Sequence, residues 1–375
     1  MKIAVPKERR AGEARVAASP DTVKKYVQMG FDVVVETGAG EGASIADQLY
    51  QDAGATIAPD AKAAFDADVV LKVQRPTDDE VAMLKEGSTL IASLSALTNK
   101  DLVQKLAGRK VTAFAMELVP RITRAQSMDI LSSQANLAGY KAVLDAAYEF
   151  TRGIPMMMTA AGTIAPARFL ILGAGVAGLQ AIATAKRMGG VVYAFDVRPA
   201  VKEQVESLGG KFVEVDPEAT KDAETSGGYA KEMSEDYKRK QADKIAETLR
   251  KTDIAICTAL IPGKPAPVLI TEEMVKGMRP GSVIVDLAVE AGGNCPLSEL
   301  DKVVVKHGVT LVGYGNVPAR LAVDASALFA KNLLNFITPL VDKETKSLKF
   351  NWDDEILKGS CVTRDGQIVH PGLAG

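Results

Sequence analysis

A glycine-rich turn followed by a carboxylate is the pattern in this chain whose spacing most clearly predicts chemistry. Gly173, Gly175 and Gly178 follow a short apolar run, and Asp196 stands 18 residues after the last of them, at the end of a second apolar run. In a strand–turn–helix–strand unit, the first glycine turns the chain, the second lets the backbone approach a pyrophosphate, and the third allows close helix packing. The helix start attracts phosphate, and the acid accepts hydrogen bonds from ribose hydroxyls. A merely structural glycine turn is the alternative, but the complete pattern predicts an NAD site, because the acid would repel the 2′-phosphate of NADP.

A second group of polar side chains lies between Arg121 and Ser132. These twelve residues contain two arginines, a glutamine, an acid and several hydroxyls, without a regular polar face. A helix cap made by a serine or aspartate is one interpretation. The other is a polar loop that faces a nicotinamide ring and fixes its carboxamide without donating or accepting protons.

Two further loops each follow a predicted strand. The first is Thr258–Lys264 and the second is Asp286–Gly293, and both are rich in small residues. Small residues would let the adenosine and ribose of a nucleotide lie against the backbone. Gly292 and Gly293 fit ordinary turns equally well, so both interpretations stay open.

Residues for acid–base chemistry are scarce. The chain has two histidines, His307 and His370, and neither follows the carboxyl end of a predicted strand. We therefore expect both to be surface residues rather than the proton-transfer groups that alcohol or amine oxidation requires. The three cysteines are widely spaced, which predicts neither a disulfide framework nor a metal site and fits a reducing, cytoplasmic compartment.

Composition and length narrow the class of protein. A chain of 375 residues predicts two domains, and a net charge of −2 gives no electrostatic reason to expect nucleic acid as a partner. The N-terminus begins directly with a predicted strand and lacks the apolar region of a signal peptide. The stretch 154–185 is apolar, but prolines and glycines interrupt it. We interpret it as a buried parallel strand with its packed helix in a soluble protein, rather than as a membrane span.

Strands and helices alternate along the chain, as in parallel sheets covered on both faces. A helix should begin near Ser19, Pro20 and Asp21, which form a typical helix start. The strands predicted in the first third are Lys2–Val5, Val33–Glu36, Val69–Val73, Thr89–Ala92 and Thr112–Ala115. Those predicted in the second set are Phe169–Leu172, Val191–Phe195, Lys211–Val215, Ile254–Cys257, Val283–Leu287 and Thr310–Gly313.

The predicted fold is α/β, with two doubly wound Rossmann-like parallel-sheet domains that are joined by long helices and have a cleft between them. The linking helices are expected at Ser132–Tyr148 and Ala319–Phe336. The first domain is discontinuous, residues 1–132 plus 320–375, with the C-terminal tail around Trp352 as its final layer. Residues 133–319 form the NAD-binding domain.

A charged segment at about 216–250 is longer than ordinary α/β loops. One interpretation is a solvated helical hairpin. We favour a mobile loop in which Gly227 and Gly228 act as a hinge that lets Tyr229 close over bound nucleotide.

These features together resemble the NAD(H)-binding component, the domain I or alpha-subunit type, of proton-translocating nicotinamide nucleotide transhydrogenases. The resemblance covers essentially the whole chain, and its most specific stretches are Arg124–Gln134, Gly173–Gln180, Gly227–Met233, Thr258–Thr271 and Asp286–Asn294. It implies that Arg121 and Gln126 lie at or beside the nicotinamide ring, with Asp129 and Ser132 toward the carboxamide and ribose. It also maps that family's mobile loop onto the charged segment and so supports the role of Tyr229.

The resemblance completes the predicted set of site residues, which includes no metal ligand. The catalytic residues are Gln126, Arg121 and Asp129. The expected NAD(H) contacts are Ser132, Gly173, Gly175, Val176, Ala177, Gly178, Asp196, Val197, Arg198, Tyr229, Thr258, Ala259, Leu260, Leu287 and Glu290.

Further expectations concern activity and partners. The resemblance implies Re/Si-specific hydride transfer from NADH to NADP⁺ held on a separate NADP(H)-binding component, and proton translocation by a membrane component. It also implies a homodimer, held at the inner face of the cytoplasmic membrane through these partners.

The alanine dehydrogenases share this two-domain fold and provide the competing hypothesis. The chain is similar to them at Arg15, where that family holds the substrate carboxylate. Their lysine, histidine and aspartate correspond here to Gln74, Ser95 and Glu290. Loss of a proton-transfer group typically lowers a rate by about 10²–10⁴-fold, so these differences disfavour amino-acid oxidation. Hydride transfer between two nicotinamides needs no such group.

Overall fold

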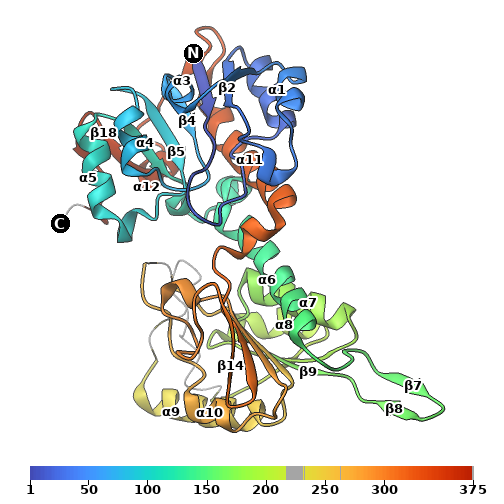
Figure 1. Cartoon of the computed structure of the whole chain (residues 1–375). Coiled ribbons are helices and arrows are strands. Elements are labelled where there is room, and N and C mark those ends of the chain that lie inside the picture. Colours follow the sequence, from blue (N-terminus) through green and yellow to red (C-terminus); the bar gives the residue numbers. More distant parts are fainter. Residues whose placement is uncertain (217–230, 232, 262, 374–375) are drawn as a thin grey trace. The chain divides into compact units, whose positions relative to one another are not determined.

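The computed structural model describes residues 1–216, 231, 233–261 and 263–373 (Figure 1). The chain divides into two compact units. Unit 1 comprises Met1–Gln134 and Pro318–Gly375, and unit 2 comprises Ala135–Val317.

Unit 1 is built on a sheet of eight strands in the order β19-β18-β6-β5-β4-β1-β2-β3. Its parallel strands are β1 (Lys2–Val5), β2 (Asp32–Glu36), β3 (Thr56–Ala58), β4 (Val69–Leu71), β5 (Thr89–Ala92) and β6 (Thr112–Ala115). Two C-terminal strands, β18 (Cys361–Arg364) and β19 (Gln367–Ile368), extend the sheet in antiparallel fashion beyond β6. Its helices are α1 (Pro20–Gln28), α2 (Asp47–Asp52), α3 (Ala61–Phe65), α4 (Asp78–Met83), α5 (Lys100–Gly108), α11 (Ala322–Ile337) and α12 (Glu355–Ser360), and β16 (Val341–Asp342) pairs with β17 (Ser347–Leu348).

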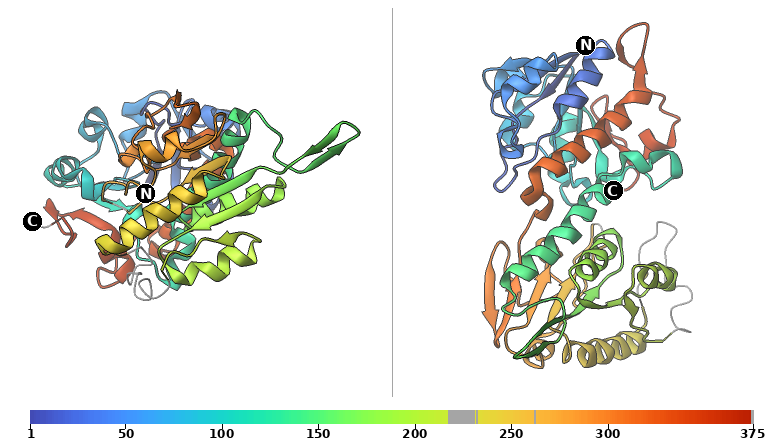
Figure 2. Two further views of the ribbon diagram at one scale, coloured as in Figure 1. Left: turned by 90° about the horizontal axis from the view of Figure 1, so that it is seen from below. Right: turned by 90° about the vertical axis from the view of Figure 1, so that its right-hand side faces the viewer.

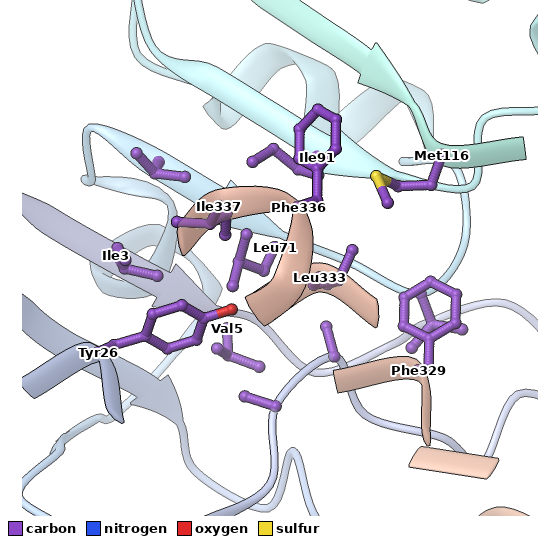
Figure 3. Close-up of a cluster of buried hydrophobic side chains, with 14 of the residues drawn as sticks. Ile3, Val5, Tyr26, Leu71, Ile91, Met116, Phe329, Leu333, Phe336 and Ile337 are labelled. Carbon is purple, nitrogen blue, oxygen red and sulfur yellow. The ribbon is translucent and has the colours of Figure 1, made fainter. Parts of the chain in front are cut away.

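Alternate residues of each strand in unit 1 enter different cores, because side chains alternate across a sheet. Ile3 and Val5 of β1 lie in one cluster with side chains from α1 and α11, whereas Ala4 lies in a second cluster with side chains from α3, α4 and α5. In the first cluster, α11 presents Phe329, Leu333, Phe336 and Ile337 to the strands (Figure 3). The sheet is therefore buried on both faces.

The predicted start of α1 is confirmed in detail. The Ser19 side chain accepts a hydrogen bond from the Thr22 amide, and the Thr22 hydroxyl accepts one from the Ser19 amide. Pro20 occupies the first helical position. The expected packing of the tail is also seen, since the Trp352 ring stacks on Phe114 at 6.3 Å between centroids.

Unit 2 contains a seven-stranded sheet in the order β11-β10-β9-β12-β13-β15-β14. Its parallel strands are β9 (Arg168–Leu172), β10 (Val191–Phe195), β11 (Lys211–Phe212), β12 (Ile254–Cys257), β13 (Val283–Asp286) and β15 (Val309–Val312), and β14 (Val303–Lys306) is an antiparallel edge strand. The helices are α6 (Ile130–Glu149), which enters from unit 1, and α7 (Val176–Arg187), α8 (Lys202–Ser207), α9 (Glu235–Leu249) and α10 (Glu272–Lys276). The expected class of two doubly wound sheets is confirmed.

The strand order of unit 2 reverses between β9 and β12. From β9 the chain proceeds to β10 and β11 on one side, and then to β12 and β13 on the other. In open α/β sheets, ligands bind outside the carboxyl ends of the strands at such a switch point. The loops after β9, β10, β12 and β13 are therefore the candidates for a binding site.

The apolar stretch 154–185 is only partly what we expected. Residues from Arg168 onward form the buried strand β9 and the helix α7. Before them, β7 (Met157–Thr159) and β8 (Gly162–Ile164) form a fully exposed two-stranded hairpin that extends away from the sheet of unit 2 (Figure 2). The prediction of burial was wrong here, because apolar composition alone does not distinguish a core strand from an exposed one. None of the helices in the described residues has the length and apolar character needed to cross a membrane.

The second half of the charged segment forms a packed helix. Ser234 caps the start of α9, and Tyr237, Ile245 and Leu249 are buried on its inner side. It contributes to the core on the face of the sheet opposite α7. The predicted hinge at Gly227 and Gly228, and Tyr229, lie outside the described residues.

Candidate functional site

The three glycines after β9 have three different surroundings. Gly173 has a positive φ of 99°, and a Cβ there would lie 2.6 Å from the Thr258 hydroxyl. Gly178 packs on the carbonyl of Gly173 so closely that a Cβ would overlap that oxygen. Gly175, by contrast, has ordinary dihedral angles, and the nearest atom to its Cβ position is Arg198 Nη2, 4.0 Å away. The first and third glycines thus shape the turn, while the second leaves open space beside the start of α7, as a pyrophosphate requires.

Asp196 lies directly after β10 and reaches back to the glycine turn. Its Oδ2 accepts a hydrogen bond of 2.7 Å from the amide of Ala174, and the residue is 9% exposed. Arg198 donates its backbone amide and Nε to Oδ1 and its Nη2 to Oδ2. The predicted acid therefore stands at the edge of the turn, held in a fixed orientation.

Thr258 joins the glycine turn to the next strand. Its amide donates to the carbonyl of Leu172, and its hydroxyl lies 2.9 Å from the carbonyl of Gly173. The side chain thereby fixes the carbonyl against which Gly178 packs. Whether Thr258 also contacts nucleotide stays a prediction.

Asn294 and Asp286 hold the two loops that follow β12 and β13. Asn294 is fully buried, and its Nδ2 donates to the carbonyls of Ala259 and Pro267, both at 2.8 Å. Asp286 is also fully buried, and it accepts hydrogen bonds from the amides of Ala288, Asn294 and Cys295. Neither residue was among the predicted site residues. A polar residue directly after a double glycine, within an otherwise small-residue loop, was the signal that could have identified Asn294.

The other predicted contacts in unit 2 surround the same loops. Val176 and Ala177 open α7, and Val197 lies between the acid and Arg198. Leu260 is exposed, and Leu287 donates its amide to the carbonyl of Cys257. Glu290 is exposed and accepts a hydrogen bond from the amide of Asn316.

The predicted nicotinamide loop lies in unit 1. Arg121 and Gln126 are exposed, the latter on the 3-10 helix Thr123–Met128. Asp129 accepts hydrogen bonds from the amide and the hydroxyl of Ser132 at 2.9 and 2.5 Å. Asp129 therefore caps the start of α6, so the helix-cap interpretation describes Asp129 and Ser132 in this structure.

Distant parts of unit 1 support this loop. Arg124 forms a forked pair with the carboxylate of Asp354, at 2.8 and 2.9 Å. The side-chain amides of Asn332 and Asn335 on α11 both donate to the carbonyl of Ser127. The loop is thus held by α11 and by the start of α12.

Neither histidine belongs to the loops that surround the glycine turn. His307 is in the tight turn between β14 and β15, at the amino edge of the parallel strands, and its Nε2 is 2.8 Å from Glu272 Oε1. His370 lies in the C-terminal segment of unit 1, where burial lowers the pKa of its imidazole. Within unit 2, His307 therefore lies at the opposite edge of the sheet from the loops that follow the carboxyl ends of the strands.

Two of the residues that match the substrate site of alanine dehydrogenases, Arg15 and Gln74, belong to a closed polar cluster in unit 1. Arg15 is 5% exposed and donates from Nε and Nη2 to the two carboxylate oxygens of Glu13. Its Nη1 donates to Gln134, and Gln74 donates to Glu13. The guanidinium thus already holds an internal carboxylate, and Ser95 has a hydroxyl in place of an imidazole.

A buried ionic group lies beside this cluster. The Lys72 ammonium is 3.0 Å from both Glu8 and Glu80, and all three side chains are almost fully buried. Burial raises the pKa of Glu8, although Lys72 and the amide of Val73 oppose this change. These contacts join the segment after β1 to the end of β4 and the start of α4, so their role is to shape unit 1.

Comparisons with known proteins agree on one family. Residues 4–138 match the family described as "Alanine dehydrogenase/PNT, N-terminal domain", and residues 142–371 match "Alanine dehydrogenase/PNT, C-terminal domain". The chain is 68% identical to an NAD(P) transhydrogenase subunit alpha polypeptide of Rhodospirillum rubrum, over 100% of this chain and 99% of the relative. It is 30% identical to the alanine dehydrogenase of Halomonas elongata, over 100% of this chain and 96% of that protein. A crystal structure of transhydrogenase from Sinorhizobium meliloti superimposes with a TM-score of 0.90 at 51% identity, covering 98% of this chain and 100% of the other.

Proposed function

The chain belongs to the alanine dehydrogenase/PNT family, and from this premise we propose that it is the NAD(H)-binding subunit of a proton-translocating NAD(P) transhydrogenase. Its cofactor is NAD(H). The observation that carries the proposal is the open space at Gly175, beside the start of α7 and close to the Asp196 carboxylate at the end of β10. This arrangement fits a dinucleotide, because backbone amides meet the pyrophosphate and the acid meets hydroxyl groups.

The reaction we propose is direct hydride transfer, Re/Si-specific, between NADH on this subunit and NADP⁺ on a partner. Bound NADH supplies the hydride from its nicotinamide ring. The chain's own residues bind and orient: the glycine turn and Asp196 anchor one end of the nucleotide, and Gln126 and Arg121 fix the ring and its carboxamide. Asp129 and Ser132 hold the loop that presents these two side chains. Catalysis then comes from proximity and from exclusion of water, which together supply several kcal/mol.

The residues at the substrate positions of alanine dehydrogenases support transhydrogenation over amino-acid oxidation. Gln74 and Ser95 cannot shuttle a proton as lysine and histidine do. The Arg15 guanidinium is paired with Glu13 and Gln134, so a 2-oxo acid would compete with an internal carboxylate. The identity of 68% to a transhydrogenase subunit, against 30% to an alanine dehydrogenase, favours the same assignment.

The proposal requires partners. We propose that a separate component binds NADP(H), that a membrane component conducts protons, and that this subunit is held through them at the inner face of the cytoplasmic membrane. The R. rubrum relative is named as a subunit, alpha, which supports the view that the enzyme has further subunits.

We also propose that the subunit is a homodimer. Six of the larger apolar side chains exposed in the described residues fall within 25 positions, on α6, on the hairpin β7–β8 and directly before it: Tyr140, Tyr148, Met156, Met157, Met158 and Ile164. The segment 155–167 contains no charged residue. An isolated two-stranded hairpin is marginally stable in water, so a partner surface that covers it would stabilise it.

Reconstitution tests the proposed function. The subunit is mixed with a transhydrogenase NADP(H)-binding component, and NADH-driven reduction of an NADP analogue is followed spectroscopically. We expect turnover that depends on both proteins. Gln126→Asn should still bind NADH but transfer hydride far more slowly, whereas normal transfer would remove the role assigned to that side chain. NADH oxidation by pyruvate and ammonium with the subunit alone would identify an alanine dehydrogenase instead.

A further inference from the structure

The carboxylate of Asp196 has all of its hydrogen-bonding capacity in use within the chain. A carboxylate offers about four acceptor positions, two on each oxygen. Oδ1 accepts from the backbone amide and the Nε of Arg198, both at 2.9 Å. Oδ2 accepts from the amide of Ala174 and from Nη2 of Arg198, both at 2.7 Å. A ribose hydroxyl can therefore bind this acid only where a bond to Arg198 is released.

The guanidinium that occupies Asp196 lies at the nucleotide site itself. Its Nη2 is 4.0 Å from the position of a Cβ on Gly175, the glycine that leaves space for the pyrophosphate. The side chains of Arg198 and Asp196 are 16% and 6% exposed, so the pair is largely shielded from solvent. An arginine fork in such a position is suited to phosphate as well as to carboxylate.

We propose that Arg198 is a specificity-determining residue and that its pairing with Asp196 is what excludes NADP(H). This inference rests on the proposed NAD(H) site and deepens it. The negative charge of Asp196 is largely neutralised by the guanidinium, so simple repulsion of a 2′-phosphate is weakened. Exclusion arises because the carboxylate already holds the guanidinium that would bind that phosphate. Arg198 is thus a phosphate anchor kept out of use by its neighbour two residues away.

The same geometry affects NADH. The ribose hydroxyls of NADH must displace Nε or Nη2 of Arg198 from Asp196 before they can bind. Arg198 therefore competes with NADH for Asp196. Asp196 in turn keeps Arg198 from binding the 2′-phosphate of NADP(H). Two opposite effects on two nucleotides follow from a single ion pair.

Direct titration of the intact subunit with NADH and NADPH, by fluorescence or calorimetry, tests this inference. In Asp196→Asn the amide no longer holds the guanidinium fork, and we expect NADPH to bind at least about tenfold more tightly than to the wild type, equivalent to about 1.4 kcal/mol. NADH should bind more weakly to this variant. The gain for NADPH should be lost in D196N/R198L, and it should decrease steeply with added salt, as expected for a contact between charges.

Two further variants keep the inference testable. Arg198→Leu alone should bind NADH more tightly than the wild type, because the competitor is gone, and should gain nothing for NADPH. Lys202 pairs with Glu214 at 2.8 Å one turn further along, so D196N/K202L is the matched control for loss of a nearby positive charge and should keep the NADPH gain.

Several outcomes would overturn the inference. NADPH binding by D196N/R198L as tight as by D196N would show that Arg198 is not the anchor. Weaker NADH binding by R198L would show that Arg198 assists NADH rather than competing with it, and this readout stands even where D196N fails to fold. Failure of the wild type to bind NADH would instead contradict the proposed function, so the two failures are distinguishable.

Discussion

Asn294 binds Ala259 through both ends of its side-chain amide. Its Oδ1 accepts a hydrogen bond of 3.1 Å from the Ala259 amide, and its Nδ2 donates one of 2.8 Å to the Ala259 carbonyl. Because Nδ2 also donates to Pro267, one buried residue fixes both ends of the loop after β12. The loop is predicted to contact nucleotide, and its shape depends on the buried side chain of Asn294.

Replacement of Asn294 should therefore affect nucleotide binding without direct contact. In Asn294→Asp the acceptor remains, but the carboxylate cannot donate to the carbonyls of Ala259 and Pro267, and a carboxylate at this fully buried position costs further unfolding free energy. We expect a lower melting temperature and weaker NADH binding, measured by thermal unfolding and fluorescence titration. Asn351→Asp, the same change in an exposed turn, is the control. Unchanged NADH affinity in N294D would contradict this role of Asn294.

Alanine at two of the glycines should separate binding from folding. Gly175 has ordinary dihedral angles and open space, so Gly175→Ala should fold, with at most a modest loss of stability because alanine is a poorer N-cap than glycine. Its methyl group should occupy the space proposed for the pyrophosphate. Gly178→Ala should lose about 1–3 kcal/mol or more of unfolding free energy, because its Cβ overlaps the Gly173 carbonyl. Urea unfolding and NADH titration measure both effects. Wild-type NADH affinity in G175A would place the pyrophosphate elsewhere.

The stability of unit 1 should depend on pH through His370. Burial lowers the pKa of this imidazole below 6.5, and its Nδ1 accepts a hydrogen bond from the Gly372 amide that protonation would break. The unfolded chain therefore binds this proton more readily than the folded chain, so His370 contributes stability above about pH 6.5 that is lost as the pH falls through its folded value. As the pH is lowered from 8 to 5.5, the wild type should therefore lose more unfolding free energy than His370→Gln does. A difference between the two proteins that stays constant over this pH range would contradict the role of His370.

Polar substitution on the hairpin should weaken the proposed homodimer. Met156 is 60% exposed and Met158 is 78% exposed, so M156S/M158S removes apolar surface without opening a core. We expect a larger monomer fraction in sedimentation velocity, with NADH binding retained. Val305→Ser, at a residue that is 66% exposed on the edge strand β14, is the matched control and should not change the mass. An unaltered dimer in M156S/M158S would place the interface elsewhere.

Most strands were predictable because parallel strands buried on both faces appear as short, continuous apolar runs. The runs Thr89–Ala92 and Ile254–Cys257 match β5 and β12 residue for residue. Several strands that we missed lie at or next to the end of a sheet. β14 is only partly buried, and β18 pairs with β6, nearly 250 residues earlier, so local sequence carries little sign of either. The hairpin β7–β8 was missed for the opposite reason, since its apolar residues resemble a core.

The residues of the candidate site likewise fall into those that a local sequence pattern predicted and those that it did not. The glycine turn and Asp196 belong to one local unit, so their spacing alone was enough to bring them together. Asn294 acts on residues 27 and 35 positions away, and Arg124 acts on Asp354, 230 positions away. Those contacts depend on which strands become neighbours, and no short sequence pattern records that.

The contacts that hold the 123–128 loop also limit the order in which parts of the protein can fold during synthesis. Arg124 emerges from the ribosome long before Asp354, and Ser127 emerges long before Asn332 and Asn335, which hold its carbonyl. All of unit 2 is translated in the interval. Since domains fold as units while the chain grows, unit 2 can fold while the N-terminal portion of unit 1 still awaits its last helices. The turn that we propose for the nucleotide phosphates can therefore form before the loop that we propose for the reactive ring has taken its shape.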